Sequence, residues 1–143
     1  MSNPSGLLSG VRVIESSLLG PGFVATFLSD LGADVIKVEP PSGDYIRQMT
    51  WPIVNGVSLL HLHTHRGKKG VCLNLKTPEG VQLYKDLVAK ADVVVEAMRP
   101  GSLAKLGIGY ADLKKVNHVY VIKNKFKQER DSLELKTQQQ GDN

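Results

Sequence analysis

Three cationic side chains gather in the short stretch RGKKG, where Arg66, Lys68 and Lys69 stand beside Gly67 and Gly70. An arginine can hold a phosphate through two parallel hydrogen bonds, a lysine acts as a compact point charge, and glycines let the backbone approach a ligand. The pattern is therefore typical of a site for an anion. A solvated surface turn has the same composition, and the local sequence leaves both interpretations open.

Nucleic acid is not the anion that this stretch indicates. The cluster is short, and no aromatic residues alternate with its charges to stack on bases. The formal net charge of +4 in 143 residues suits an anionic ligand without requiring a polynucleotide. We therefore predict no nucleic-acid partner.

Three histidines precede the basic stretch at alternate positions, namely His61, His63 and His65. On a strand they would share one face, an arrangement in which paired imidazoles bind zinc. No further ligand completes such a site nearby, and the adjacent Arg66 and Lys68 would repel a dication. We predict no metal here and expect polar or partly packed histidines.

A second candidate for chemistry is the GPG stretch formed by Gly20, Pro21 and Gly22. Glycines ahead of a helix let backbone amides approach an anion at the helix N-terminus. The stretch is not G-x-G-x-x-G, and no P-loop lysine follows it. Taken alone, it favours a plain tight turn.

The elements that would position these residues alternate between strand and helix. Strands over 11–15 and 34–39 enclose a helix over 23–31, with the GPG stretch as the turn before it. Such a βαβ unit predicts a parallel sheet whose ligands lie beyond the carboxyl ends of the strands. The stretches 58–65 and 70–76 are predicted to be two further strands joined by the basic turn.

The second half of the chain continues the alternation. Thr77 is a good helix N-cap, with Pro78 at the first helical position and Glu79 near the positive helix end, so a helix is predicted to run to about Lys90. The remaining expected elements are a buried strand over 92–96, a turn over 99–101, short helices over 102–106 and 111–116, and a strand over 119–122.

Composition limits the organisation of the chain. With 41% apolar residues in 143, one globular core is expected, so we predict one domain over 1–122. The polar segment 123–143 holds few large apolar residues and is expected to be a disordered or loosely docked tail. No run is apolar enough to span a bilayer and no secretory signal is visible, so we expect a cytoplasmic protein with no membrane partner. Cys72 is the single cysteine, which excludes an internal disulfide.

Three segments, taken in order, resemble the N-terminal part of the family III CoA-transferases. They are GVRVIESSLLGPGFVATFLSDLGADVIKVEPPSGD, HRGKKGVCLNLKTPEG and ADVVVEAMRPGSLAKLGIGYADLKKVN, and the resemblance covers residues 7–120. It implies a Rossmann-like, three-layer α/β domain with a mainly parallel sheet, incomplete relative to the family. It also implies a homodimer in which two long chains interlock as rings.

The resemblance further implies a ligand, which is coenzyme A or acyl-CoA as a substrate, with no metal. The basic turn would meet the nucleotide phosphates, the GPG stretch would line the thioester end, and the region around the RPG turn would flank the nucleotide. The residues implied are, in that order, Arg66, Lys68 and Lys69; Gly20, Pro21 and Gly22; and Met98, Arg99 and Lys105.

The resemblance also has departures. Pro40 and Pro41 stand where some relatives have an arginine, which puts that contact in doubt. The family's catalytic aspartate, which carries CoA through an aspartyl-CoA intermediate, has no counterpart in this sequence. We therefore assign no catalytic residue, and the acyl donor and acceptor acid stay open. Three interpretations follow: the N-terminal part of a CoA-transferase, an inactive truncated CoA-binding module, or a fragment of an acyl-CoA racemase.

Overall fold

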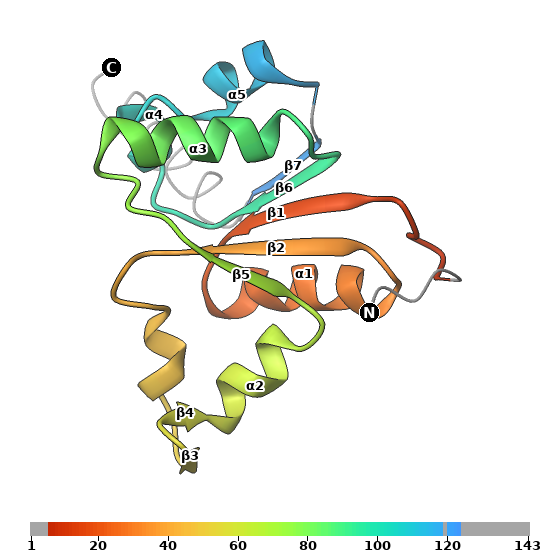
Figure 1. The fold of residues 1–143 in the computed structure, drawn as a ribbon, viewed down its shortest axis with the longest axis vertical. Coiled ribbons are helices and arrows are strands. Elements are labelled where there is room, and N and C mark those ends of the chain that lie inside the picture. Colours follow the sequence, from red (N-terminus) through yellow and green to blue (C-terminus); the bar gives the residue numbers. More distant parts are fainter. Residues whose placement is uncertain (1–5, 119, 124–143) are drawn as a thin grey trace, which may run out of the picture.

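Five parallel strands form the central sheet of the protein, which we describe from a computed structural model covering residues 6–118 and 120–123. The strands are β1 (Arg12–Ser16), β2 (Asp34–Glu39), β5 (Lys69–Cys72), β6 (Val93–Glu96) and β7 (Tyr120–Lys123). Their order across the sheet is β5-β2-β1-β6-β7, and every neighbouring pair is parallel (Figure 1). Doubly wound nucleotide-binding sheets begin with this order, in which the direction of winding reverses at β1. The predicted α/β fold with a parallel sheet is confirmed.

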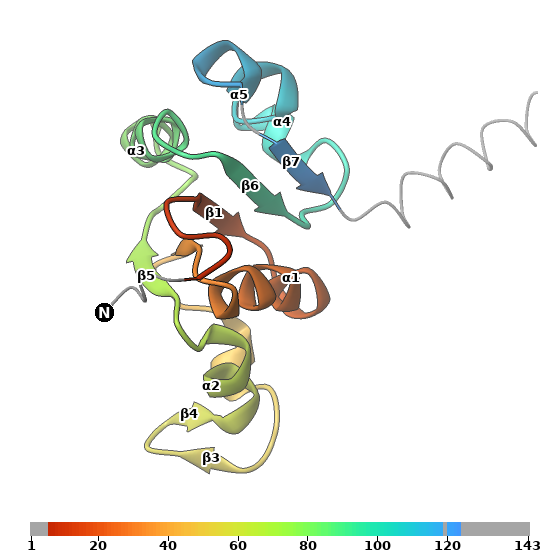
Figure 2. The same cartoon turned by 90° about the vertical axis from the view of Figure 1, so that its right-hand side faces the viewer.

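Helices cover both faces of this sheet, giving three layers. Helix α1 (Leu19–Asp30) lies on one face, and α3 (Pro78–Val88), α4 (Ser102–Lys105) and α5 (Tyr110–Val116) lie on the other (Figure 2). Among the described residues, no helix has both the length and the apolar character that crossing a membrane requires. Of the predicted tail over 123–143, Lys123 instead ends β7, and residues 124–143 lie outside the part of the chain that the structure describes.

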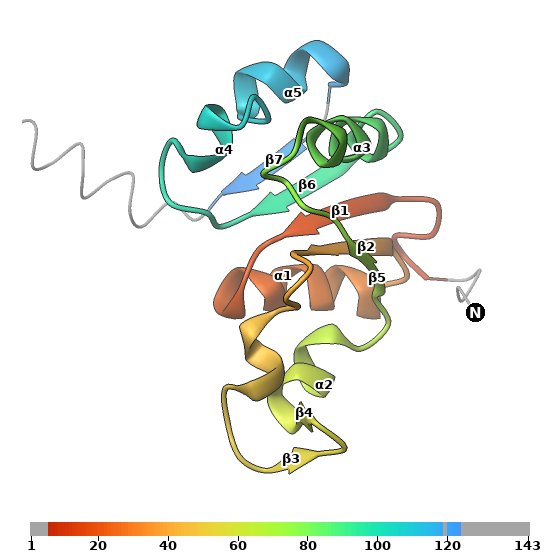
Figure 3. The same ribbon diagram turned by 60° about the vertical axis from the view of Figure 1, so that its left-hand side comes forward.

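A long excursion leaves the sheet between β2 and β5. It contains the 3₁₀ helix η1 (Tyr45–Gln48), the short antiparallel strands β3 (Ile53–Val54) and β4 (Val57–Ser58), and α2 (Leu59–His65). Figure 3 shows this excursion on the same side of the sheet as α1. Residues 37–72 can therefore build a site against that face.

The alternation of strand side chains explains the two cores. Ile14 and Val94 are fully buried against the layer that holds α3, together with Tyr84. Val13 and Val35 point the other way and pack with residues of α1. The Tyr84 hydroxyl lies 3.0 Å from Ser16 Oγ, and burial raises the pKa of Tyr84 to about 12.

The prediction of a strand over 58–65 is wrong, because these residues form a capped helix. The hydroxyl of Ser58 accepts a hydrogen bond from the His61 backbone N–H at 3.1 Å, which satisfies a donor of the first turn of α2. Thr64 is the one β-branched residue in the stretch, so its propensity does not oppose a helix. The three histidines consequently do not share a strand face.

The GPG stretch is also placed differently from the prediction. Helix α1 begins at Leu19, so Gly20, Pro21 and Gly22 form its first turn rather than a turn before it. Proline is tolerated there because backbone N–H groups of the first turn have no partner within the helix. The start of α3 was predicted correctly. Thr77 caps this helix, and its hydroxyl accepts a hydrogen bond from the Gly80 N–H at 3.2 Å.

Candidate functional site

The winding of the sheet reverses at the carboxyl ends of β1 and β6, where the chain leaves the two strands toward opposite faces. β1 leads into α1, and β6 leads through residues 97–101 to α4. Crevices of this kind are where doubly wound sheets bind ligands. The topology therefore brings the GPG stretch to the same sheet edge as Met98 and Arg99, with Lys105 on the short helix that follows.

The chain leaving β1 has an uncommon backbone. Leu19 has φ 47°, in the left-handed region that leucine rarely adopts. A Cβ on Gly22 would lie 3.3 Å from Glu15 Oε1, so glycine lets the first turn of α1 come close to this buried carboxylate. Gly20 faces open space. Strained backbone next to an open glycine is typical of a ligand-binding turn.

The turn after β6 is held by its own hydrogen bonds. The Met98 N–H donates to Glu96 Oε2 at 3.0 Å, and the Ser102 N–H donates to the Arg99 carbonyl at 3.0 Å. Gly101 has φ 76°, which a residue with a side chain adopts at a cost. The predicted turn over 99–101 is confirmed.

The three cations of the basic stretch do not lie together. Arg66 pairs with Asp30 at the end of α1, through Nη2 to Oδ2 at 2.5 Å. Lys69 opens β5 and pairs with Asp34 at 2.5 Å, at the amino edge of the sheet. The hydrogen bond from Lys69 lowers the pKa of Asp34. These two cations therefore lie away from the carboxyl edge.

Lys68 turns inward instead. Its side chain is 1% exposed, and its Nζ lies 2.7 Å from Glu15 Oε2 and 2.8 Å from the carbonyl of Gly22. Burial lowers the pKa of Lys68, although the carboxylate of Glu15 opposes the shift. Lys68 thus ties the basic stretch to the first turn of α1.

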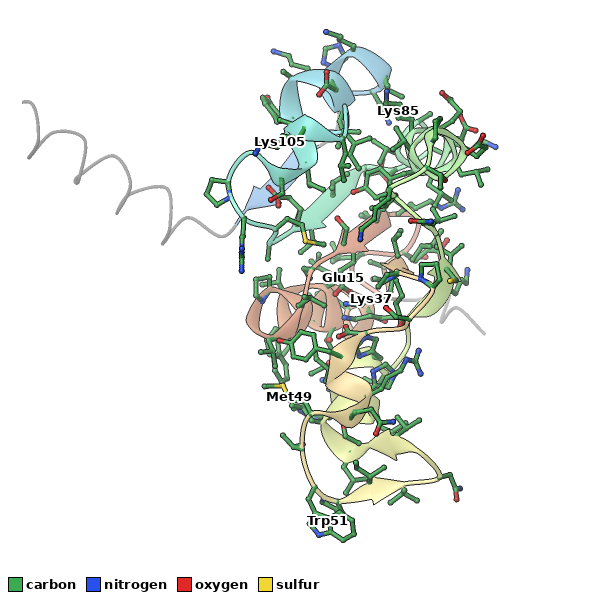
Figure 4. All side chains as sticks on the ribbon, turned by 90° about the vertical axis from the view of Figure 1, so that its left-hand side faces the viewer. Glu15, Lys37, Met49, Trp51, Lys85 and Lys105 are labelled. Carbon is green, nitrogen blue, oxygen red and sulfur yellow. The ribbon has the colours of Figure 1, made fainter. Side chains whose placement is uncertain are left out.

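Lys68 belongs to a buried charged layer, which we define as Glu15, Lys37, Asp44 and Lys68. Lys37 Nζ lies 2.9 Å from Glu15 Oε1 and 3.1 Å from Asp44 Oδ2, and it also donates to the carbonyl of Ser17. Figure 4 shows Glu15 and Lys37 side by side at the centre of the molecule. Because these two residues follow Val13 and Val35 by two positions, the face toward α1 changes from apolar to charged toward the carboxyl edge.

His65 extends this charged layer through its contact with Asp44. His65 Nε2 lies 3.4 Å from Asp44 Oδ2, close enough for a charge interaction but without hydrogen-bond geometry. Burial raises the pKa of Asp44, but the contacts with His65, the Ile46 N–H and Lys37 outweigh it, so the pKa lies well below its usual range. Asp44 is therefore held as a carboxylate.

Glu39 at the end of β2 is held in the same way. Arg47 binds it through Nε and Nη2 at 3.0–3.1 Å, and the Asp44 N–H donates to its Oε2 at 2.8 Å. Burial raises the pKa of Glu39, but these hydrogen bonds and the charge of Arg47 lower it further than burial raises it.

A cavity of about 290 Å³ opens beside the charged layer, and we call it the α2 cavity. It lies between α2, β2 and the start of β5. Its lining consists of Lys37, Glu39, Arg47, His61, Leu62, His65, Arg66, Lys68 and Gly70. A neighbouring cavity of about 430 Å³ follows the carboxyl ends of β2 and β5, over residues 39–43 and 70–72 with Arg47.

His61 is the buried histidine of the α2 cavity. It is 6% exposed, its Nδ1 has no hydrogen-bond partner among the described residues, and its ring stacks on His65 at 3.8 Å. Burial, together with the positive charges of His65 and Arg47, lowers the pKa of His61 to about 4. The ring is therefore neutral near pH 7. In the described part of the chain, no three metal-ligating side chains are grouped for a metal ion.

This shift predicts a loss of stability in mild acid. The folded pKa of His61 is about 4 and the reference value is 6.5, so between these values the unfolded chain binds a proton that the folded chain does not. The free energy of unfolding should then fall by up to about 1.4 kcal/mol per pH unit as the pH drops through that window. Urea unfolding from pH 7 to pH 4 should show a shallower slope for His61→Phe than for the native chain.

The exposed His63 on the same helix supplies the control. The slope for His61→Phe should be shallower than that for His63→Phe, because only the first of these two rings is buried. Equal slopes for His61→Phe and the native protein would contradict the assignment. The contribution of Asp44 lies below its reference pKa of 3.8 and so outside the window.

Sequence reasoning missed the charged layer and the cavity beside it. A usable signal was present, because Glu15 and Lys37 interrupt otherwise apolar strands at positions that share a face. The contribution of Asp44, His61 and His65 had no such signal, since it depends on α2 being a helix and on how the excursion folds back.

Comparisons with known proteins place the chain among related sequences. Residues 8–128 match CoA-transferase family III. The chain is 44% identical over 112 residues to the succinyl-CoA–L-malate CoA-transferase beta subunit of Chloroflexus aurantiacus, covering 77% of this chain and 28% of that protein. It is 42% identical over 112 residues to the human succinyl-CoA:glutarate CoA-transferase, covering 76% of this chain and 25% of that protein.

A solved structure agrees with these matches. A CAIB/BAIF family protein from Brucella suis superposes with a TM-score of 0.75 at 39% identity, covering 82% of this chain and 33% of that one. The chain thus spans between a quarter and a third of the length of the relatives it matches.

Proposed function

Because the chain belongs to CoA-transferase family III, we propose that it is the CoA-binding part of an enzyme that moves CoA from an acyl-CoA to a carboxylic acid. The observation that carries the proposal is the meeting of two loops at the carboxyl edge of the sheet. The strained first turn of α1 and the turn after β6 reach this edge from opposite faces. An extended ligand with an anionic end fits such a crevice.

The proposed contacts divide the ligand between these loops. The first turn of α1, residues 20–22, lines the thioester end, where glycines leave room for a close approach. Arg99 and Lys105 supply charge to the nucleotide end, and Met98 supplies an apolar surface. The cationic side chains of Arg99 and Lys105 suit phosphates, because a hydrogen bond between charged groups is stronger than one between neutral groups.

The basic stretch has a more limited part in this proposal. Lys68 holds Gly22 and Glu15, so it positions the first turn of α1. Arg66 and Lys68 line the α2 cavity, and any phosphate contact that they make is proposed to lie there. A phosphate contact by Lys69 requires that its ammonium leave Asp34, and it stays a prediction.

None of the buried carboxylates is proposed as a nucleophile. Both oxygens of Glu15 contact lysine ammonium groups, and Asp44 is held as an ion-paired carboxylate, which weakens either as an attacking group. In the proposed reaction a carboxylate outside the matched segment attacks the thioester carbon and releases CoA thiolate. The thiolate then attacks the enzyme-derived carbonyl of the resulting mixed anhydride, which releases the donor acid and leaves CoA on the enzyme as a thioester. The acceptor carboxylate attacks this thioester to form a second mixed anhydride, and the CoA thiolate attacks its acceptor-derived carbonyl, which gives the new acyl-CoA and frees the enzyme carboxylate.

The residues described here therefore bind and orient CoA. We propose that this chain alone does not transfer it, and that the longer enzyme is a homodimer. Mixing the purified chain with succinyl-CoA and glutarate should give no glutaryl-CoA by mass spectrometry. Formation of glutaryl-CoA above the rate without protein would contradict the assignment of a binding role.

Binding itself is tested by calorimetric titration with CoA. Arg99→Ala and Lys105→Ala should each weaken binding by about tenfold or more, because one charge-assisted hydrogen bond contributes about 1.5–3 kcal/mol. Lys90→Ala is the matched control, since this exposed lysine lies between α3 and the amino end of β6. Equal affinities for all three variants and the native chain would refute the proposed site.

A further inference from the structure

The α2 cavity has a chemistry of its own that the proposed contacts at the carboxyl edge do not use. We infer that it binds one small oxyanion, a carboxylate or a phosphate group, between the ring of His61, Lys68 and Arg47. The inference rests on the lining of the cavity and on polar groups that the fold leaves with bonding capacity.

The lining is strongly cationic, although the region as a whole is balanced. Four cations line the cavity, namely Lys37, Arg47, Arg66 and Lys68, against the single carboxylate of Glu39. The acids paired with the others, Glu15, Asp44 and Asp30, are not among the residues that line the cavity. A ligand in the cavity therefore meets an excess of positive charge, which favours an anion and opposes a metal dication.

Two of these cations have spare donors. An ammonium group carries three N–H bonds, and Lys68 Nζ uses two of them, on Glu15 and the Gly22 carbonyl. Arg47 binds Glu39 through Nε and Nη2, which leaves Nη1 without a partner among the described residues. Lys37 is less suited to bind an anion, because its ammonium group already contacts three acceptors, namely Glu15, Asp44 and the Ser17 carbonyl.

His61 supplies the most specific part of the argument. The ring of His61 lines the cavity and is 6% exposed, and neither of its nitrogens has a hydrogen-bond partner among the described residues. Nδ1 is enclosed by protein. Because the neutral ring can place its proton on either nitrogen, the other nitrogen, Nε2, can donate to an oxyanion. The cavity, with a volume of about 290 Å³, has room for one carboxylate or phosphate group.

Two sources can provide such a group: a free small anion, or one phosphate of CoA. Only the second source rests on the proposed function. The distinction is experimental, because inorganic phosphate and CoA can be added separately and together.

The test follows the ring signals of the four histidines by NMR at pH 7 during titration with inorganic phosphate, and in parallel with malonate. We expect saturable shifts at His61 and smaller ones at the exposed His118. His61→Phe should weaken phosphate binding by about fivefold or more, whereas His63→Phe should leave it unchanged. The native titration is informative even if His61→Phe fails to fold: no saturable shift at His61 with phosphate, malonate or CoA would overturn the inference.

The CoA arm identifies the source. If CoA displaces phosphate and shifts the same His61 signals, the site holds a phosphate of CoA. If both bind at once, it holds a free anion. Arg99→Ala should weaken CoA binding and leave phosphate binding unchanged, so failure of the CoA proposal and failure of the oxyanion site give different results.

Discussion

Replacing Lys37 with methionine is expected to lower the free energy of unfolding by about 3–5 kcal/mol, the range for breaking a buried ion pair from one side. The Lys37 side chain is 2% exposed and touches two carboxylates, Glu15 and Asp44, whose own side chains are fully buried. Methionine keeps most of the volume but removes the charge and the hydrogen bond to the Ser17 carbonyl. Glu15 would retain Lys68, whereas the pair left to Asp44 in the described part of the chain, with His65 at 3.4 Å, is ionic only when that ring is protonated.

Lys69→Met is the matched control, because it removes the same charge from the next strand of the sheet. Lys69 is 68% exposed and its pair with Asp34 is solvated, so the expected loss is below about 1 kcal/mol. Urea unfolding followed by circular dichroism measures both variants. A Lys37→Met protein within 1 kcal/mol of Lys69→Met would show that the charged layer is not the stabilising feature the contacts indicate.

The sheet could be predicted because its signals are local. The strand over 34–39 was predicted at its observed limits, since a β-branched run ends there at two prolines. Thr77 and Pro78 likewise mark the start of α3 through cap chemistry that two residues determine. Such signals do not depend on distant contacts, and the order of elements then gave the parallel sheet.

The excursion could not be predicted in the same way. Within the stretch 58–65, residues 60–63 alternate apolar and polar, which is the strand period, yet residues 59–65 form a helix that Ser58 caps. With a strand, the histidines share one face. In the helix, His61 and His65 lie about one turn apart, so their rings stack. Because the stretch was assigned to a strand instead of a helix, the α2 cavity could not be predicted.

The basic stretch shows a second limit of sequence reasoning. Adjacent charges in the sequence suggest one anion site, but successive side chains of an extended chain point to opposite sides, and Lys68 pairs with Glu15 whereas Lys69 pairs with Asp34. Their partners, Glu15 and Asp34, are distant in sequence and carry no mark of the pairing. What the stretch does is decided by tertiary contacts, and these assign Lys68 to positioning the first turn of α1.

Gly80→Ala is expected to destabilise the protein by about 2 kcal/mol, even though alanine is the better helix former by about 1 kcal/mol. A Cβ at this position in α3 would lie 2.1 Å from the carbonyl oxygen of Asn74 and 2.7 Å from its carbonyl carbon. Both atoms are backbone, so the loop from β5 or the first turn of α3 would have to move. Steric overlap therefore outweighs propensity.

Gly20→Ala is the comparison, because it also lies in the first turn of a helix but faces open space. There the gain in propensity should act alone, leaving stability unchanged or raised by up to about 1 kcal/mol. Thermal unfolding of the two variants distinguishes the cases. If Gly80→Ala melts at or above the native temperature, the close approach of α3 to Asn74 is not required, and the loop that joins β5 to α3 is looser than these contacts indicate.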